Sequence, residues 1–206
     1  MNDNNILAVI LAGGKSKRFG EDKNLAKLGS ISLIEHTIYK IREKFKKILI
    51  IANNDLKVEE FKDIEIIPDH IKGNLGPLVG VLTAMKWAKH SKENYKWIAT
   101  FPSDTPFFDS SIIEKYEKKI IKNDSPLYFV RSDDKRHNIF GLWSLDLLDI
   151  LEEDIVKNNF RKVEDWANKI GVKTINIKFK KFDPFLNINT KEDLIEAEKI
   201  LKNYKK

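Results

Sequence analysis

The sequence contains no cysteine, and this absence argues against several classes of function at once. Disulfide bonds, zinc–thiolate centres and thiol nucleophiles all require the missing side chain. The four histidines lie too far apart in the sequence to match the spacing of a metal-ligand motif. They are His36, His70, His90 and His137. We therefore expect neither a structural zinc site nor cysteine-dependent catalysis.

Long hydrophobic runs are also missing. No apolar stretch approaches the roughly 20 residues that a membrane helix requires. The first residues, "MNDNN", lack the basic-then-apolar layout of a secretory signal, so we expect a cytoplasmic protein with no membrane partner. No repeat, low-complexity segment or Gly/Ser/Pro-rich linker interrupts the chain. Its 206 residues, 42% of them hydrophobic, are expected to form a single compact domain, residues 1–206.

The chain is basic, with 37 Lys and Arg against 31 Asp and Glu and a net charge of +6. Such a balance suits an anionic substrate or a nucleic acid. The lysines are, however, interleaved with acidic residues in stretches such as "KIREKFKK" and "EKYEKKIIK". No basic and aromatic residues cluster as they do in nucleic-acid-binding surfaces. We expect a solvated lysine-rich surface and no nucleic-acid partner.

Apolar runs alternate with amphipathic helical stretches along most of the chain. The predicted strands are residues 6–12, 47–53, 64–68, 97–101, 127–130, 139–143 and 172–179. The early runs are continuously apolar, which is typical of parallel strands covered on both faces. The alternation predicts a doubly wound α/β fold, in which ligands bind beyond the carboxyl ends of the strands. The loops after residues 12, 53, 68 and 101, and a fifth loop at 185–190, are therefore the candidate site.

Several helices carry recognisable start signals. Ser32 with Glu35, and Ser111 with Glu114, both match the capping-box pattern. Pro77 stands near the first position of the helix that begins at "GPLVG", and Thr190 opens the last helix.

The segment "LAGGKSKRFGEDK", residues 11–23, follows the first predicted strand. It contains Gly14-Lys15-Ser16, the last three letters of the P-loop pattern G-x-x-x-x-G-K-[ST]. That pattern needs a glycine five positions before Gly14, where this chain has Val9. A dinucleotide-binding G-x-G-x-x-G cannot be laid over these glycines either. Both interpretations are excluded.

The loop still has the chemistry to hold phosphates. Adjacent glycines let the backbone approach a ligand closely, and successive N–H groups can bind phosphate oxygens. Arg18 can donate to two oxygens at once, and Lys23 adds a mobile point charge. The alternative is a surface loop with ordinary solvated cations.

The pattern L-A-G-G-x-S-x-R-x-G-x-D-K resembles the opening motif of the molybdenum cofactor guanylyltransferases (MobA-like proteins). Related cytidylyltransferases that act on the same pterin typically read L-A-A-G and lack the aspartate, so Gly13-Gly14 and Asp22-Lys23 favour the guanylyl branch. The resemblance implies an α/β, three-layer Rossmann-like nucleotidyltransferase fold with a mostly parallel central sheet. It also implies that GTP is bound by residues of this loop, namely Leu11, Ala12, Gly13, Gly14 and Lys23.

The segment "PSDTPF", residues 102–107, places Asp104 at the carboxyl end of a predicted strand. Mg²⁺ commonly takes one or two protein carboxylates and completes its shell with waters and phosphate oxygens. The alternative is an aspartate that bonds its own backbone in a turn. The family commonly has C-D-x-P here, so Ser103 replaces a cysteine. The resemblance implies that Asp104 binds Mg²⁺ and the nucleotide, and that Asp104, Arg18 and Lys23 are catalytic.

The segment "PDHIKGNLGPLVG" resembles the family pattern D-x(n)-G-P-L-x-G. By this resemblance Asp69 contributes to the GTP site, and the alternative is a turn residue. The segment "IANND" matches less well, because Ile51 stands where the family can have a nucleotide-contacting asparagine. Asn53, two residues later, is a further candidate.

Near the C-terminal end, "FLNINTKEDL" resembles the family pattern F-x-N-[IV]-N-T-x-E-[DE]-L. The resemblance implies that Asn187 and Asn189 bind the pterin substrate. The alternative is that the segment only caps the last helix, through Thr190 and Asp193. In "RSDDKRHNIFGLW", His137 fits the family but Asn138 stands where proline is usual, so the role of His137 stays open.

The activity implied by the resemblance is transfer of GMP from GTP to the terminal phosphate of molybdopterin or Mo-molybdopterin, with release of pyrophosphate. The implied partners are GTP, molybdopterin, and proteins of molybdenum cofactor biosynthesis and insertion. One alternative is a related nucleotidyltransferase that uses CTP or a sugar or alcohol phosphate acceptor. Another is a non-catalytic nucleotide-binding adaptor, although such a protein has no chemical need for Arg18, Lys23 and Asp104 together.

Overall fold

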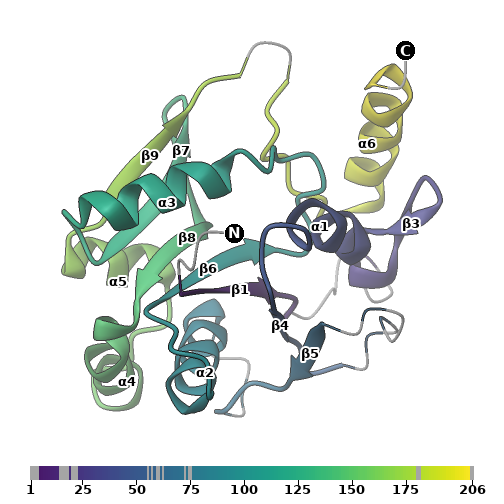
Figure 1. Cartoon of the computed structure of the whole chain (residues 1–206). Coiled ribbons are helices and arrows are strands. Elements are labelled where there is room, and N and C mark those ends of the chain that lie inside the picture. Colours follow the sequence, from purple (N-terminus) through teal and green to yellow (C-terminus); the bar gives the residue numbers. More distant parts are fainter. Residues whose placement is uncertain are drawn as a thin grey trace.

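The computed structural model describes residues 5–13, 19, 23–54, 56, 58, 61, 63–71, 73, 76–179 and 182–204. Its centre is a seven-stranded sheet with the order β5-β4-β1-β6-β8-β7-β9 (Figure 1). The strands are β1 (Ile6–Leu11), β4 (Ile48–Ile51), β5 (Ile64–Ile67), β6 (Trp97–Pro102), β7 (Leu127–Ser132), β8 (Lys135–Ser144) and β9 (Lys173–Ile177). Strand β8 is antiparallel to both of its neighbours, and the other neighbouring pairs are parallel. The mostly parallel α/β sheet expected from the sequence is confirmed.

The continuous apolar runs explain the parallel half of the sheet. Residues 7–10 of β1 are fully buried, and β1 pairs in parallel with β4 on one side and β6 on the other. Because alternate side chains of a strand point to opposite faces, such burial requires a layer of helices on each face. The carboxyl ends of β4, β1 and β6 therefore lie at the same edge of the sheet.

Helices cover both faces and complete three layers. Helices α1 (Leu33–Ile41) and α3 (Ile112–Lys122) contribute to one hydrophobic core. Helices α2 (Pro77–His90), α4 (Leu148–Val156) and α5 (Val163–Ile170) contribute to a second core on the other face. Figure 1 shows α1 and α3 above the sheet and α2 and α4 below it. The three-layer arrangement is the one that the sequence resemblance implied.

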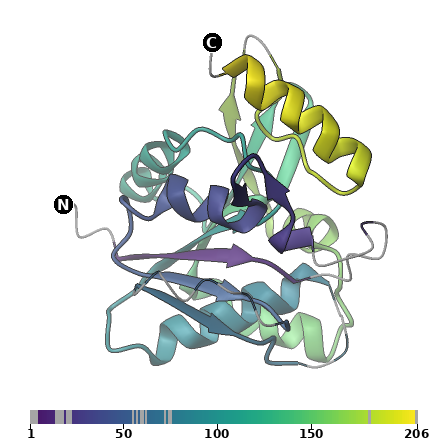
Figure 2. The same ribbon diagram turned by 90° about the vertical axis from the view of Figure 1, so that its right-hand side faces the viewer.

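A smaller core lies beside the sheet. It joins the hairpin of β2 (Lys27–Leu28) and β3 (Ile31–Ser32) to the last helix, α6 (Lys191–Tyr204). Buried Leu28 and Leu33 pack there with Ala197. Figure 2 shows α6, in yellow, lying across the upper part of the molecule near this hairpin. Among the described residues, two 3₁₀ turns complete the elements, η1 (Lys23–Leu25) and η2 (Leu145–Leu147).

Three of the four helix-start signals are confirmed. The Ser32 and Glu35 side chains form both bonds of the capping box at α1. Pro77 is the first residue of α2, and Thr190 accepts from the backbone N–H of Asp193 at the start of α6.

The capping box predicted at Ser111 is wrong. Ser111 is already helical in conformation, and its side chain makes no cap hydrogen bond. Its backbone N–H instead donates to Asp109 Oδ1 at 2.7 Å. The carboxylate of Asp109 thus binds the Ser111 N–H, which the capping box would have assigned to the Glu114 side chain.

The second half of the chain contains structure that the predicted elements did not include. The strand predicted at 139–143 spans Lys135–Ser144 and forms a hairpin with β7, with Asp133 in the turn at φ 46°. Helices α4 and α5 were also missing from the prediction. Trp166 of α5 is buried and stacks on Trp143 of β8, with 5.9 Å between the ring centroids.

No helix in the described part of the chain combines the length and the apolar character needed to cross a bilayer.

Candidate active site

A cleft of about 640 Å³ lies beyond the carboxyl ends of the parallel strands. Its volume is within the range of pockets that hold small-molecule ligands. All five loops that the topology argument singled out contribute to it. The residues that line it are Leu11, Gly13, Lys23, Asn24, Ile51, Asn53, Asp69, Gly76, Pro77, Gly80, Pro102, Ser103, Asp104, Lys135, Arg136, His137, Asn138, Ile139, Phe140 and Asn187.

The structure brings most of the predicted site residues to this one cleft. Six of them line it directly: Leu11, Gly13, Lys23, Asp69, Asp104 and Asn187. Ala12 and Asn189 contact lining residues, through Asn24 and Lys23 respectively. Gly14 and Arg18 lie outside the described residues.

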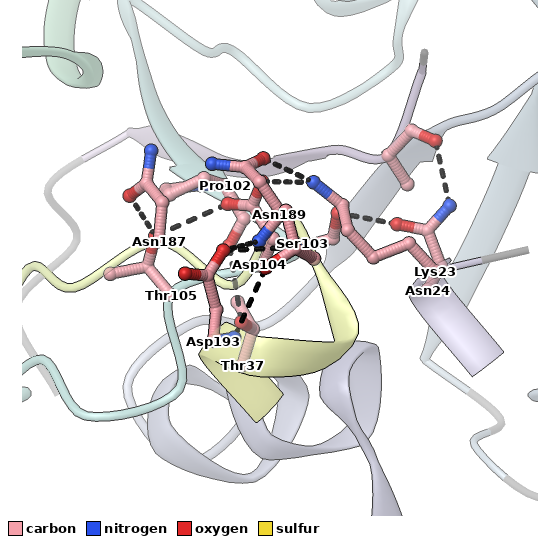
Figure 3. A network of polar contacts seen from close by, with 12 residues as sticks. Lys23, Asn24, Thr37, Pro102, Ser103, Asp104, Thr105, Asn187, Asn189 and Asp193 are labelled. Carbon is pink, nitrogen blue, oxygen red and sulfur yellow. Dashed lines mark hydrogen bonds and ion pairs between the residues drawn. The ribbon is translucent and has the colours of Figure 1, made fainter. Parts of the chain in front are cut away.

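The first and fourth loops meet at an ion pair. Lys23 Nζ lies 2.6 Å from Asp104 Oδ2, and only 16% and 17% of the two side chains are exposed. The same Nζ donates to Asn189 Oδ1 at 2.9 Å. Figure 3 shows the Lys23 side chain reaching between Asp104 and Asn189. One ammonium group therefore holds together three loops that are far apart in the sequence.

Asp104 is tied to the C-terminal loop by two further contacts. Its backbone carbonyl accepts from the N–H of Ile188 at 2.9 Å. The Thr105 hydroxyl lies 3.2 Å from Asp104 Oδ1 and 2.9 Å from Asn187 Oδ1. Because the hydroxyl carries one hydrogen, it donates to one of the two oxygens at a time. Both Asp104 and Asn187 are thereby held in place before any ligand binds.

Buried polar contacts anchor the loop that follows β1. Asn24 Nδ2 donates to the carbonyl of Ala12 at 3.0 Å, and Ser103 Oγ donates to Asn24 Oδ1 at 2.6 Å. Ser103 and Asn24 are both buried. The serine at this position therefore fixes the first loop against the fourth. Sequence reasoning missed Asn24, whose only signal was its position next to Lys23.

Asn53 and Asp69 form a reciprocal pair on neighbouring strand ends. Asn53 Nδ2 donates to Asp69 Oδ2 at 2.8 Å, and the Asp69 backbone N–H donates to Asn53 Oδ1 at 3.0 Å. Because an amide side chain can donate and accept at once, it matches both groups of Asp69. The family pattern had left Asn53 as an additional candidate, and the structure places it beside Asp69 in the cleft.

Helix α2 begins at the cleft, and glycines allow its close approach. Gly76 has φ +87°, and a Cβ there would lie 2.8 Å from the Arg161 carbonyl oxygen. A Cβ on Gly80 would lie 3.1 Å from Leu11 Cδ2 and 3.6 Å from Asp69 Oδ1. The α2 N-terminus, with its free N–H groups and partial positive charge, is thus brought against the ends of β1 and β4.

The opposite wall of the cleft comes from residues 135–140. Sequence reasoning had noted His137 and Asn138 there and a strand from 139, but it had assigned none of them to the site. Arg136 is fixed by donating from Nε to Asn138 Oδ1 at 2.8 Å and from Nη1 to Asn168 Oδ1 at 2.9 Å. The paired aspartates of "SDDK" are the sequence signal for the hairpin turn that forms this wall.

Ser132 and His137 form a serine–histidine pair, with Oγ and Nε2 2.6 Å apart. The pair does not have the geometry of a nucleophile and its base, because Ser132 is 2% exposed and does not line the cleft. Burial lowers the pKa of His137 to about 4, against an opposing effect of Asp183 and a smaller lowering by Lys135. His137 is therefore a neutral imidazole near pH 7.

The donor set fits a cation that is shared with a polyphosphate. Within the described ranges, no three His, Asp or Glu residues gather closely enough to hold a metal by themselves. The cleft does offer the carboxylates of Asp69 and Asp104 and the amide of Asn187. Hard cations such as Mg²⁺ bind through one or two carboxylates when phosphate oxygens complete the shell.

Comparison with known proteins gives matches that span this cleft. A family model described as "MobA-like NTP transferase domain" matches residues 8–170. A molybdenum cofactor guanylyltransferase of Rhizobium rhizogenes is 32% identical over 197 residues, which are 93% of this chain and 90% of the relative. A molybdenum cofactor guanylyltransferase of Rhizobium johnstonii is 31% identical over 206 residues, and the alignment covers 98% of this chain and 95% of the relative.

Solved structures give the same fold. The crystal structure of molybdopterin-guanine dinucleotide biosynthesis protein A from Archaeoglobus fulgidus superimposes with a TM-score of 0.76. The alignment covers 96% of this chain and 99% of that chain, at 24% sequence identity. At this identity the likeness shows the fold, and the three-layer architecture described above agrees with it.

Proposed function

The chain belongs to the MobA-like NTP transferase domain family, and on this premise we propose that it transfers GMP from GTP to the terminal phosphate of molybdopterin. The product is the guanine dinucleotide form of the cofactor, and pyrophosphate is released. Relatives named molybdenum cofactor guanylyltransferase cover nearly the whole chain at 31–32% identity, which supports this activity over other nucleotidyl transfers.

One observation carries the proposal at the level of chemistry. Gly13 and Lys23, which follow β1, and Asp104, which follows β6, line one cleft, and Lys23 contacts Asp104. A cation and a carboxylate from adjacent parallel strands are what a nucleoside triphosphate with a divalent cation requires. The cation neutralises phosphate oxygens directly, and the carboxylate does so through the metal.

The nucleotide is assigned to the half of the cleft formed by the ends of β1, β4 and β5. Leu11 and Gly13 line this half, with Ala12 between them held by Ile51 and Asn24, and Asp69 offers a carboxylate held by Asn53. The N-terminus of α2 faces the same region, where its partial positive charge favours an anionic ligand. We assign the triphosphate to Lys23, with Gly14 and Arg18 as further contacts from the same loop.

A divalent cation belongs to this proposal, and we assign Mg²⁺ to Asp104. When bound, the cation supplies neutralisation of negative charge on the phosphates of GTP. The Asp104 carboxylate is already oriented by Lys23 and Thr105, and the Asp104 backbone carbonyl accepts from the N–H of Ile188. Because the carboxylate is oriented before the reaction, the protein does not have to reorganise around it during the reaction step.

The reaction needs no strong general base. The acceptor is a phosphate monoester with a charge of about −1.5 to −2 at neutral pH, so its oxygen is already a nucleophile. That oxygen forms a bond to the α-phosphorus of GTP, while the bond from the α-phosphorus to the bridging oxygen of the β-phosphate breaks. The electron pair leaves with pyrophosphate. The protein contributes by positioning two anions and by neutralising charge, which is the role of Lys23 and Arg18.

The acceptor is assigned to the other half of the cleft. Asn187 lines it, and Asn189 contacts Lys23 at its edge. The amide oxygens of both side chains accept protein hydrogen bonds, from Thr105 and Lys23 respectively. The amide NH₂ groups are therefore the ends that bind the pterin in this proposal. The proposal also includes delivery of the product, in the cytoplasm, to proteins of cofactor biosynthesis and insertion.

The test is a pyrophosphate-release assay with each nucleoside triphosphate, with and without molybdopterin, in the presence of Mg²⁺. We expect release only when GTP and molybdopterin are both present. In parallel, GTP with Mg²⁺ should raise the thermal midpoint of unfolding and CTP should not, because only the bound nucleotide stabilises the folded state.

Other outcomes contradict the proposal and identify a different activity. Release with CTP indicates a cytidylyltransferase, and release with a sugar or alcohol phosphate indicates a different acceptor. A thermal shift with GTP but no release with any acceptor indicates a nucleotide-binding adaptor.

A further inference from the structure

The wall of the cleft opposite the nucleotide loops contains a break in the sheet. On β7, Phe129 and Val130 are consecutive, yet their partners on β8 are Gly141 and His137. Residues 138–140 of β8 therefore bulge from the sheet. The Thr100 hydroxyl fixes this bulge by donating to the carbonyl of Ile139 at 2.7 Å. Bulges of this kind commonly change the direction of a side chain beside an active site.

His137 stands at the start of this bulge, and two contacts fix its ring. The imidazole stacks on Phe185, with ring centroids 4.4 Å apart and planes at 27°. Its Nε2 lies 2.6 Å from Ser132 Oγ. With the ring plane and one nitrogen fixed, the direction of the other nitrogen, Nδ1, is fixed as well.

Nδ1 is the ring nitrogen of His137 that remains for a ligand. His137 is mostly buried but lines the cleft, and its hydrogen bond to Ser132 uses Nε2. Nδ1 makes no hydrogen bond within the described part of the chain and is not among the buried polar atoms that lack a partner there, so it keeps some access to solvent. Because the Ser132 hydroxyl can donate or accept, Nδ1 can accept from a ligand or donate to one.

The His137 ring is suited to binding an uncharged group. Burial lowers the pKa of His137 to about 4, so the ring carries no charge near pH 7. Asn187, two residues after Phe185, lines the same cleft, and its oxygen accepts from Thr105. Figure 3 shows the amide nitrogen of Asn187 turned away from Thr105. His137 and Asn187 thus offer neutral hydrogen-bonding groups to the cleft, although the charged Lys135 and Arg136 line the same wall.

We propose that His137 is a binding residue for the acceptor, and that its Nδ1 forms a hydrogen bond with an uncharged polar group of the acceptor's heterocycle. The phosphate of the same acceptor then lies toward Lys23 and Asp104. This inference rests on the proposed function. It adds a residue that binds the heterocycle of the acceptor and does not contact the nucleotide.

Two substitutions at one position test it. In His137→Asn the short amide places a polar atom near the position of Nδ1, and in His137→Gln the longer amide places one near Nε2, beside Ser132. If Nδ1 binds the acceptor, His137→Gln should raise the KM for molybdopterin about tenfold, as expected for the loss of one hydrogen bond. His137→Asn should raise it by about threefold or less. The KM for GTP should change less than about twofold in both.

A purely structural role predicts the opposite order. In that case His137→Gln, which keeps a partner for Ser132, would be the milder change, and this order would overturn the proposal. Equal increases in the KM values for GTP and for the acceptor would overturn it too. If both amide variants unfold, His137→Phe serves instead, because it keeps the aromatic stack on Phe185. It should raise the KM for molybdopterin about tenfold and leave the KM for GTP unchanged.

The control is His90→Gln, at the last residue of α2, thirteen residues beyond the helix start that lines the cleft. Both KM values should remain at the wild-type level. Wild-type protein that releases no pyrophosphate with GTP and molybdopterin contradicts the proposed function, and with it the acceptor that His137 would bind. If the wild type turns over and His137→Gln leaves the KM for the acceptor unchanged, the assignment of His137 is contradicted and the proposed function is not.

Discussion

Lys23 Nζ and Asp104 Oδ2 are 2.6 Å apart, although 81 residues separate them in the sequence. The pair is mostly shielded from solvent, and each partner has a second contact, Lys23 with Asn189 and Asp104 with Thr105. A divalent cation would compete with Lys23 for the Asp104 carboxylate, and the phosphates of a nucleotide would compete with Asp104 for the Lys23 ammonium group. The ammonium group therefore serves as the counter-charge of Asp104 when no ligand is bound.

The first prediction follows from this competition. Lys23→Met should lower kcat for pyrophosphate release by about 10²–10³-fold, because a charge-assisted contact to the transition state is lost. The same variant should bind Mn²⁺ more tightly than the wild type when nucleotide is absent, since Asp104 no longer pairs with an ammonium group. Calorimetric titration with Mn²⁺ measures this. Lys44→Met, on an exposed lysine, is the control. A change in kcat of less than about twofold would place Lys23 outside the site.

The second prediction concerns the carboxylate. Asp104→Asn keeps the shape of the side chain and the backbone contact to Ile188, but removes the charge that would bind the metal. Metal-dependent turnover should fall by at least about 10²-fold with an unchanged circular dichroism spectrum. Asp109→Asn is the matched control, since Asp109 caps the start of α3 and does not line the cleft. Full activity of Asp104→Asn would exclude Asp104 as the metal ligand.

The third prediction separates the two halves of the cleft. Asn53→Ala removes both hydrogen bonds to Asp69, so the Asp69 carboxylate loses its fixed orientation. The dissociation constant for GTP should rise about tenfold, in line with the loss of a hydrogen bond to a charged group. The KM for molybdopterin should stay within about twofold. Asn94→Ala, on an exposed loop, is the control. An effect on the acceptor equal to that on GTP would show that Asp69 does not belong to the nucleotide half alone.

The fourth prediction concerns pH and stability. The pKa of His137 is about 4 in the folded protein, below its ordinary value of 6.5, because burial disfavours the charged form. Asp183 opposes this effect and Lys135 adds to it. Between these two pKa values the unfolded chain binds the proton and the folded chain does not. The contribution of His137 to the free energy of unfolding is therefore full above pH 6.5 and is lost as the pH falls toward 4.

Urea denaturation of the wild type and of His137→Phe measures this contribution. The difference in free energy of unfolding between the two proteins should be larger at pH 7 than at pH 4.5, since the variant carries no titrating ring. A difference that is the same at both pH values would show that folding does not lower the pKa of His137.

The sequence by itself determined the class of fold and the loops of the cleft. Continuous apolar runs such as residues 6–12 are stable only between two layers of helices, so they dictate a parallel sheet. Parallel strands place their carboxyl ends at one edge, and Lys23, Asp69 and Asp104 all follow such ends. The resemblance of the motifs at 11–23 and 185–194 then indicated the family. These inferences rest on local patterns, which a sequence displays directly.

Only the tertiary structure decided which side chains meet. The contacts of Asn24 with Ser103, of Asn53 with Asp69 and of His137 with Phe185 join residues that no local pattern links. The wall at 135–140 depends on a bulge whose register is set by pairing with β7 and by the Thr100 hydroxyl. The strand with the reversed direction, β8, lies between β6 and β7 in the sheet, away from its place in chain order. Long-range pairing of this kind depends on the geometry of the assembled layers, and periodicity along the chain does not encode it.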